Sequence, residues 1–344
     1  MKALVLAQAG KIAIEDREFS EHLGDTDVQI KIHSVGICGS DVHYYQHGRI
    51  GPFVVNAPMV LGHEASGVVL AVGSAVRHVQ PGDRVCMEPG IPDMQSAQSR
   101  AGIYNLDPAV RFWATPPVHG CLRETVIHPA AFTFKLPDNV SFAEGAMVEP
   151  LAIGMHAATK AAIKPGDIAL VIGAGPIGVV TALAALAGGC SDVIICDLFD
   201  EKLQVAANYT GLHAVNSKGD ALAQKVSQLT SGNGVDVVFE CSGAKPAIAS
   251  ISQHIAPGGT AVLVGMPVDA APMDIVAAQA KEVTFKTIFR YANMYPRTLR
   301  LLSSGKLRVQ PLITQTYKFA DSVAAFERAA AGNPTDIKIM LEME

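Results

Sequence analysis

Apolar and polar positions alternate in short runs over residues 1 to about 150, a pattern typical of half-buried β-strands. Gly, Pro and Asp residues separate these runs and indicate turns. This part of the chain therefore predicts a compact β-rich domain. The expected strands are Ala3–Ala7, Val28–Val35, Ala65–Val72, Arg84–Met87 and Glu124–Ile127.

From about residue 152 the pattern changes to apolar strands that alternate with helical stretches. Such alternation predicts an α/β fold, in which βαβ units form a mostly parallel sheet with helices on both faces. Beyond residue 290 we expect a helix near Ala320–Ala331 and a strand at Ile337–Leu341 that returns to pair with the first domain. The strands expected in the α/β part are Ile168–Ile172, Val193–Asp197, Val235–Glu240, Thr260–Val264 and Val283–Phe289.

The stretch Ile168–Ser191 is 24 residues long and uncharged, which is enough to cross a bilayer. Glycines and a proline interrupt it, however, so it divides into a short strand, a turn and an Ala/Leu helix. A strand and helix of this size cannot span lipid without unpaired backbone groups. We therefore expect no membrane span and no membrane partner.

Composition narrows the class of protein. A length of 344 residues fits two domains, and 49% hydrophobic against 17% charged residues excludes a disordered or fibrous chain. A net charge of -5 without a basic block argues against nucleic acid and favours a small-molecule partner. Six scattered cysteines favour free thiols in a cytoplasmic setting, and the start Met1-Lys-Ala-Leu-Val lacks the regions of a signal peptide.

The segment Gly173-Ala-Gly175-Pro176-Ile177-Gly178 follows an expected strand and opens an expected helix, which is the context of a dinucleotide-binding loop. The first glycine permits the tight turn, the second lets a pyrophosphate approach the backbone, and the third lets helix and strand pack closely. The helix N-terminus favours the anionic phosphates. These residues therefore predict a cofactor site.

Asp197 ends the next strand, 19 residues beyond Gly178, where a carboxylate can accept hydrogen bonds from the adenosine ribose hydroxyls. No arginine follows in Leu198–Lys202, and Asp200 and Glu201 add negative charge that would repel a 2′-phosphate. The sequence therefore favours NAD over NADP.

The segment Gly62-His63-Glu64-Ala-Ser-Gly67, with Gly73 and Val76 downstream, resembles the signature of the zinc-containing alcohol dehydrogenases. Gly36-Ile-Cys38-Gly-Ser40-Asp41 resembles that family's first zinc-ligand motif, and the stretch from Gly166 to Gly178 resembles its coenzyme motif. The chain is thus similar to the medium-chain dehydrogenases over most of its length. The resemblance implies a GroES-like β-rich catalytic domain, residues 1–151 and 290–344, around an inserted Rossmann NAD-binding domain, residues 152–289.

The donor types support a metal site independently of the family. A thiolate, an imidazole and carboxylates form a mixed set suited to zinc, and fewer than four protein ligands leave a position for water or substrate. Taken alone, Cys38 would more often be a buried small residue and His63 a core histidine. Together in this pattern they indicate a catalytic zinc site.

Further segments resemble the polyol dehydrogenases of the sorbitol and xylitol type. That branch places glutamate where alcohol dehydrogenases have a third zinc cysteine, and here this residue is Glu149. The resemblance implies Cys38, His63 and Glu64 as ligands, while Glu149 either binds zinc directly or holds a zinc-bound water. The segments are Cys38–Tyr44, Arg49–Gly51, Pro58–Gly67, Ala114–Pro117, Val148–Leu151 and Phe289–Tyr291.

Many relatives carry a second, structural zinc on four cysteines at spacing C-x2-C-x2-C-x7-C. In this chain that spacing falls on Asp93, Ser96, Ser99 and Asp107, which supply no thiolate. Two aspartates and two serines would suit calcium, but a solvated polar loop is the simpler interpretation. We expect one catalytic zinc per chain, no structural zinc, and a lobe that relies on its own packing or on a subunit neighbour.

The resemblance implies an oxidoreductase that transfers hydride from a secondary hydroxyl of an acyclic polyol to NAD. Ser40 and Glu149 are the competing candidates for proton acceptor, and Tyr44, Arg290 and Tyr291 are expected to orient the remaining hydroxyls. The alternatives are an alcohol or threonine dehydrogenase on the same scaffold, or a NAD-binding protein without turnover. The family also implies a homotetramer.

Overall fold

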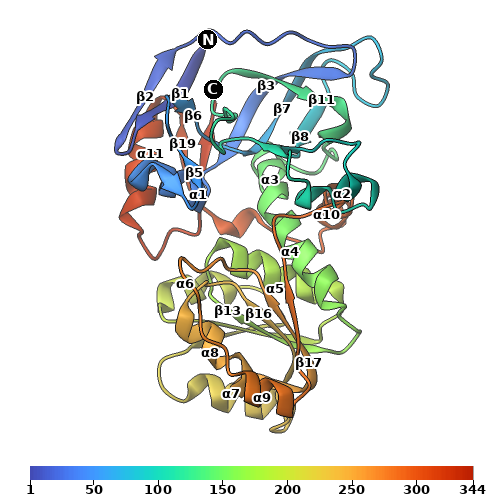
Figure 1. Cartoon of the computed structure of the whole chain (residues 1–344), viewed down its shortest axis with the longest axis vertical. Helices are drawn as coiled ribbons and strands as arrows, with labels where there is room; N and C mark the ends of the chain where they lie inside the picture. Colours follow the sequence, from blue (N-terminus) through green and yellow to red (C-terminus); the bar gives the residue numbers. More distant parts are fainter. Residues whose placement is uncertain (344) are drawn as a thin grey trace. The chain divides into compact units, whose positions relative to one another are not determined.

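The computed structural model describes residues 1–343, which form two compact units (Figure 1). Unit 1 comprises Met1–Glu149, Tyr295–Ser304 and the chain from Arg308 onward; unit 2 comprises Pro150–Met294 and Gly305–Leu307. No helix among the described residues is both long enough and apolar enough to cross a membrane.

The unit boundaries differ from the expected domain limits at residues 150–151, 290–294 and 305–307, which were expected in the catalytic domain and belong to unit 2. The chain stays with unit 2 after its last strand, and the sulfur of Met294 lies 4.0 Å from the Thr159 hydroxyl in that unit. Helix α10 (Tyr295–Ser303) then begins in unit 1, where the Tyr295 hydroxyl donates to the Met87 carbonyl at 2.9 Å.

The main sheet of unit 1 has the order β12-β8-β7-β3-β20-β19, with β11 also pairing with β3. The central strands β3 and β7 pair antiparallel. The expected strands of this unit are confirmed, with bounds that differ by one or two residues at some ends. The confirmed strands are β1 (Lys2–Gln8), β3 (Asp27–Gly36), β7 (Glu64–Val72), β8 (Arg84–Met87), β11 (Thr125–Pro129) and β20 (Lys338–Glu342). The sheet also contains β12 (Thr133–Lys135) and β19 (Ile313–Lys318), which were not expected from the sequence.

The C-terminal strand completes this sheet. β20 pairs antiparallel with β3, placing Met340 opposite Gly36, so the expected return of the chain end to the first domain is confirmed. The expected helix appears as α11 (Ser322–Ala331). Around the sheet, β1 pairs with β2 (Lys11–Asp16) and β6 (Met59–Val60), and the apolar side chains of these strands share one core.

Three further segments of unit 1 frame the candidate site. Helix α1 (Gly39–His47) follows β3, and α3 (Phe142–Ala146) precedes α4 (Val148–Ala161), whose first turn carries Glu149 in unit 1 and which continues in unit 2. A small lobe contains β9 (Gly90–Ile91), α2 (Ala97–Arg100), a 3-10 turn at Tyr104–Leu106 and β10 (Arg111–Phe112).

Unit 2 is a parallel six-stranded sheet with the order β15-β14-β13-β16-β17-β18, flanked by helices (Figure 1). The five expected strands are present, so the predicted Rossmann-type α/β fold is confirmed. They are β13 (Ile168–Ile172), β14 (Asp192–Asp197), β16 (Val235–Glu240), β17 (Ile255–Leu263) and β18 (Thr284–Thr287).

The sequence did not indicate the edge strand β15 (Leu212–Asn216). Only Leu212 and Val215 of its five residues are buried, because the strand pairs with a neighbour on one side only. The uncharged stretch resolves into β13, a glycine turn and α5 (Pro176–Gly188), as expected.

Candidate active site

Three candidate metal ligands come together in unit 1. Cys38 precedes α1, while His63 and Glu64 stand at the start of β7, and their ligand atoms all lie within 4.8 Å of one another. Gly36 on β3 makes this possible, because a Cβ there would overlap the Glu64 carboxylate. A thiolate, an imidazole and a carboxylate so placed fit zinc with one coordination position left open.

Asp41 fixes the geometry of this cluster. Its fully buried carboxylate accepts from the backbone N–H groups of Cys38 at 3.2 Å and Gly62 at 3.0 Å, and lies 3.6 Å from His63 Nδ1. At 3.6 Å the contact is electrostatic and not a hydrogen bond, and a carboxylate behind a ligating histidine favours one orientation of the ring. From the sequence, Asp41 was recognised only as part of a motif, and the available signal was an acid three residues after the cysteine.

His63 is buried, and its Nδ1 has no hydrogen-bond partner among residues 1–343. Burial by itself lowers the pKa of His63, whereas the negative charges of Asp41 and Cys38 raise it, and the net pKa lies well above the usual value. The surroundings therefore favour positive charge at this position.

Lys338 enters the same cluster from β20. Its ammonium donates to both carboxylate oxygens of Glu64, at 2.7 and 2.6 Å, and to the Ile37 carbonyl at 3.2 Å. Burial lowers the pKa of Lys338, but the negative charges of Glu64 and Cys38 raise it. The net pKa of Lys338 lies above its usual value. Lys338 was not predicted from the sequence, where the available signal was a single lysine inside the apolar run Ile337–Leu341.

Glu149 is buried beside the cluster but is outside the group of three. Its charge raises the pKa of Lys338 and contributes to raising that of Glu88, so it lies within electrostatic range of both. Burial is the main cause that brings the pKa of Glu88 to about 7; Tyr104 lowers it, and Glu149 raises it.

The other residues expected at the substrate lie on different elements. Ser40 is half-buried in the first turn of α1, and Tyr44 on the same helix is packed into the core of unit 1. Arg290 and Tyr291 belong to unit 2, where the Arg290 guanidinium lies 5.0 Å from the centre of the Phe289 ring. The roles of these four side chains toward a substrate stay predictions.

The glycine loop of unit 2 has the predicted form. Gly173 has a φ of 103°, which favours glycine, and a Cβ on Gly178 would overlap the Gly173 carbonyl. Gly175 caps α5, Pro176 occupies the first turn, and a Cβ on Gly175 would meet nothing within 4 Å. Backbone N–H groups at this helix start can therefore face a phosphate.

Asp197 lies beside that loop at the end of β14. One carboxylate oxygen accepts from the Ala174 N–H at 2.8 Å, and the other accepts from Leu198 and Phe199 at 2.8 and 3.2 Å. These bonds hold the carboxylate at the end of the strand that follows the glycine helix, where a nucleotide ribose is expected.

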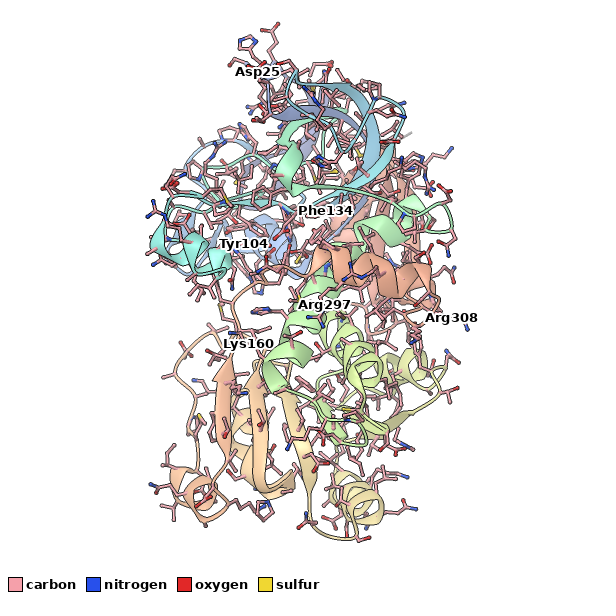
Figure 2. The ribbon with its side chains drawn as sticks, turned by 90° about the vertical axis from the view of Figure 1, so that its right-hand side faces the viewer. Asp25, Tyr104, Phe134, Lys160, Arg297 and Arg308 are labelled. Carbon is pink, nitrogen blue, oxygen red and sulfur yellow. The ribbon has the colours of Figure 1, made fainter. Side chains whose placement is uncertain are left out.

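In the lobe, hydrogen bonds hold the four residues Asp93, Ser96, Ser99 and Asp107, at which no structural zinc is expected. Asp107 accepts from the Asp93 N–H at 2.6 Å and the Ala109 N–H at 3.1 Å. Ser96 caps α2 by accepting from the Ser99 N–H at 3.1 Å. Figure 2 shows Tyr104 at this lobe, and its hydroxyl donates to Glu88 at 2.7 Å.

Comparison with known proteins gives matches to two family models. Residues 24–138 match the alcohol dehydrogenase GroES-like domain, and residues 176–304 match the zinc-binding dehydrogenase model. The former range holds Cys38, His63 and Glu64, whereas the latter holds the end of the glycine loop and Asp197.

Similar proteins match along nearly the full chain. A D-xylulose reductase from Morganella morganii is 80% identical over 331 residues, which are 96% of this chain and 98% of that one. A sorbitol dehydrogenase from Bos taurus is 43% identical, covering 99% and 96%. The crystal structure of 2R,3R-butanediol dehydrogenase from Bacillus subtilis has 32% identity and a TM-score of 0.90, covering 100% and 99%.

Proposed function

The chain belongs to the zinc-dependent medium-chain alcohol dehydrogenase family, and on that premise we propose that it is a NAD-dependent polyol dehydrogenase. It transfers a hydride to NAD from the carbon that bears a secondary hydroxyl of an acyclic polyol, such as xylitol or sorbitol, and the hydroxyl loses its proton, which yields a ketose. The observation that carries this proposal is the convergence of Cys38, His63 and Glu64 within 4.8 Å. The relatives named D-xylulose reductase and sorbitol dehydrogenase support the substrate class.

We assign Cys38, His63 and Glu64 as the metal ligands, with Glu149 beside them. When bound, zinc supplies Lewis-acid stabilisation of negative charge on the substrate oxygen. Asp41 orients His63 from behind, and the buried surroundings of the cluster strengthen each charge interaction.

Ser40 and Glu149 are the two competing candidates for acceptor of the hydroxyl proton in this proposal. Ser40 is half-buried, two residues from Cys38, and a hydroxyl can relay a proton onward. Glu149 is buried near the cluster and can hold the proton itself. Tyr44, Arg290 and Tyr291 are proposed to orient the remaining hydroxyls of the substrate.

NAD is the proposed coenzyme. The Gly173–Gly178 loop binds the pyrophosphate, with Gly175, Pro176 and Ile177 at the helix start, and Asp197 accepts from the ribose hydroxyls. A 2′-phosphate would meet the negative charge of Asp197, which disfavours NADP.

We further propose a cytoplasmic homotetramer. No disulfide joins the six cysteines, which are all free within residues 1–343, and free thiols persist in a reducing compartment. The tetramer follows from the family resemblance. Light scattering after size exclusion measures the assembly, and a mass of one or two chains would contradict it.

A substrate survey tests the proposed function. Xylitol, sorbitol, ribitol, L-arabinitol, ethanol and L-threonine are each supplied with NAD or NADP, and reduced coenzyme is followed at saturating coenzyme. We expect turnover of polyols with NAD, and Cys38→Ser run in parallel controls for contaminating dehydrogenases. Activity confined to ethanol or L-threonine would refute the polyol assignment.

A further inference from the structure

The candidate metal site contains a buried cation of its own. The Lys338 side chain is 3% exposed and that of Glu64 1%, and the ammonium bonds to both oxygens of that carboxylate. An unpaired buried charge is costly, so each of the two ions needs the other when no metal is present.

The fold holds Lys338 in this position from two directions. Strand β20 lies against β3, whose last residue Gly36 gives Glu64 its space, and the Ile37 carbonyl accepts a third bond from the ammonium. The pairing of β20 with β3 and three hydrogen bonds of the ammonium therefore hold Lys338 in the cluster.

A zinc ion at the cluster and the Lys338 ammonium require the same negative groups. Glu64 is bound by the ammonium at both oxygens, and the charges of Cys38 and Glu149 also act on Lys338. A dication near a fixed ammonium is repelled, and a carboxylate that ligates the metal must give up at least part of its pairing with lysine.

We propose that Lys338 is a positioning residue that holds Glu64 in the metal-free protein and competes with zinc for it. This inference rests on the proposed function, because it takes Cys38, His63 and Glu64 as the zinc ligands. Lys338 stabilises the empty site and weakens metal binding, so zinc affinity in this chain is set partly by a residue that is not a ligand.

The test compares Lys338→Met with the charge-retaining Lys338→Arg in the full chain. Zinc affinity is measured by competition with a chromophoric chelator, and thermal unfolding is followed after the metal is removed. For Lys338→Met we expect zinc binding to tighten by about tenfold or more, because repulsion and competition are lost. We also expect the metal-free Tm to fall by about 5 °C, because Glu64 is left buried without a partner.

Lys338→Arg keeps the charge and is expected to remain near wild type in both measurements. A lysine with a merely structural role would predict that Lys338→Met lowers zinc affinity together with stability. Weaker or unchanged zinc binding in a folded Lys338→Met protein would overturn the proposal.

The double variant Glu64→Gln/Lys338→Met covers the case in which the single variant does not fold, since it removes both buried charges together. Zinc affinity of this protein is compared with that of Glu64→Gln alone. We expect Lys338→Met to tighten binding much less in this background, because the carboxylate for which lysine competes is gone. A tightening of about tenfold here would mean that Lys338 does not act through Glu64.

Failure of the proposed function gives a different result. If Cys38→Ser binds zinc as tightly as wild type, the metal lies elsewhere and the ligand assignment fails. If Cys38→Ser loses zinc but Lys338→Met does not gain affinity, only the role of Lys338 fails.

Discussion

The metal cluster and the lobe, both in unit 1, use similar polar residues in opposite ways. In the cluster, Cys38, His63 and Glu64 converge from different segments, and Glu64 is bonded to the side chain of Lys338. In the lobe, Asp107 and Ser96 accept from backbone N–H groups of their own segment. Side-chain oxygens that accept hydrogen bonds from the backbone hold a loop together. Side-chain atoms from separate segments that face one another are placed to bind a metal ion.

Glu88 connects the two regions. It follows β8, accepts from the Tyr104 hydroxyl of the lobe, and lies within electrostatic range of Glu149 beside the cluster. Glu88 contacts the lobe directly and the cluster through its charge. Variants in the cluster, in the lobe and at Glu88 can therefore show which region determines metal binding and which determines stability.

The largest expected effect belongs to Cys38→Ser, which removes the thiolate from the cluster. We expect turnover to fall to background and bound zinc to drop from close to one per chain to near none. NAD binding should be retained, because the glycine loop belongs to unit 2. Elemental analysis and NAD titration measure these quantities.

Two outcomes would contradict the distinction between a metal-binding cluster and a lobe without metal. Unchanged activity would remove Cys38 from the site. Two zinc ions per wild-type chain would show that the lobe binds metal, contrary to the hydrogen bonding of Asp93, Ser96, Ser99 and Asp107.

Glu88→Gln has the second-largest expected effect, which is a change in stability that depends on pH. The glutamine keeps an acceptor for Tyr104 but cannot ionise. Folding raises the pKa of Glu88 from 4.5 to about 7, so the folded protein holds this proton more tightly. The corresponding stability is fully present below pH 4.5 and is lost as the pH rises through about 7.

We therefore expect Glu88→Gln and wild type to be similarly stable near pH 4.5, where Glu88 keeps its proton in the folded protein. Above pH 7, the variant should be the more stable by up to about 3 kcal/mol. Denaturant unfolding across this pH range measures the difference. The exposed Glu327 on α11 provides a control, Glu327→Gln, which should show no such trend. A pH-independent difference for Glu88→Gln would contradict the assignment.

The smallest expected effect belongs to the lobe. Asp107→Ala removes the acceptor for two backbone N–H groups and should lower the free energy of unfolding by about 1–3 kcal/mol while leaving zinc content unchanged. Ser99→Ala is the matched control, because it removes one side-chain bond, from the Ser96 hydroxyl at 3.0 Å, and keeps the Ser99 N–H that bonds to Ser96. If both variants were equally stable, the Asp107 bonds would not be what holds the lobe.

Local pattern was sufficient for most of the fold. The runs at Ile168–Ile172 and Val235–Glu240 became strands with the same bounds, because a strand buried in a parallel sheet reads as a continuous apolar run. The edge strand Leu212–Asn216 lacked that signal. Residues 150–151, 290–294 and 305–307 lie in unit 2 and not in the unit expected from the sequence, because the unit to which a connecting segment packs depends on contacts outside the segment.

In the candidate site, too, some features follow from local sequence and others depend on tertiary packing. The sequence by itself determined the donor types, the glycine loop and the acid after it, since each depends on spacing within one short segment. Only the tertiary structure decided which donors meet: it grouped Glu64 with Cys38 and His63 and left Glu149 beside them. It also brought Lys338 to Glu64 across 274 positions of the chain. The physical reason is that such a pairing depends on the packing of β20 against β3, and no local pattern encodes that contact.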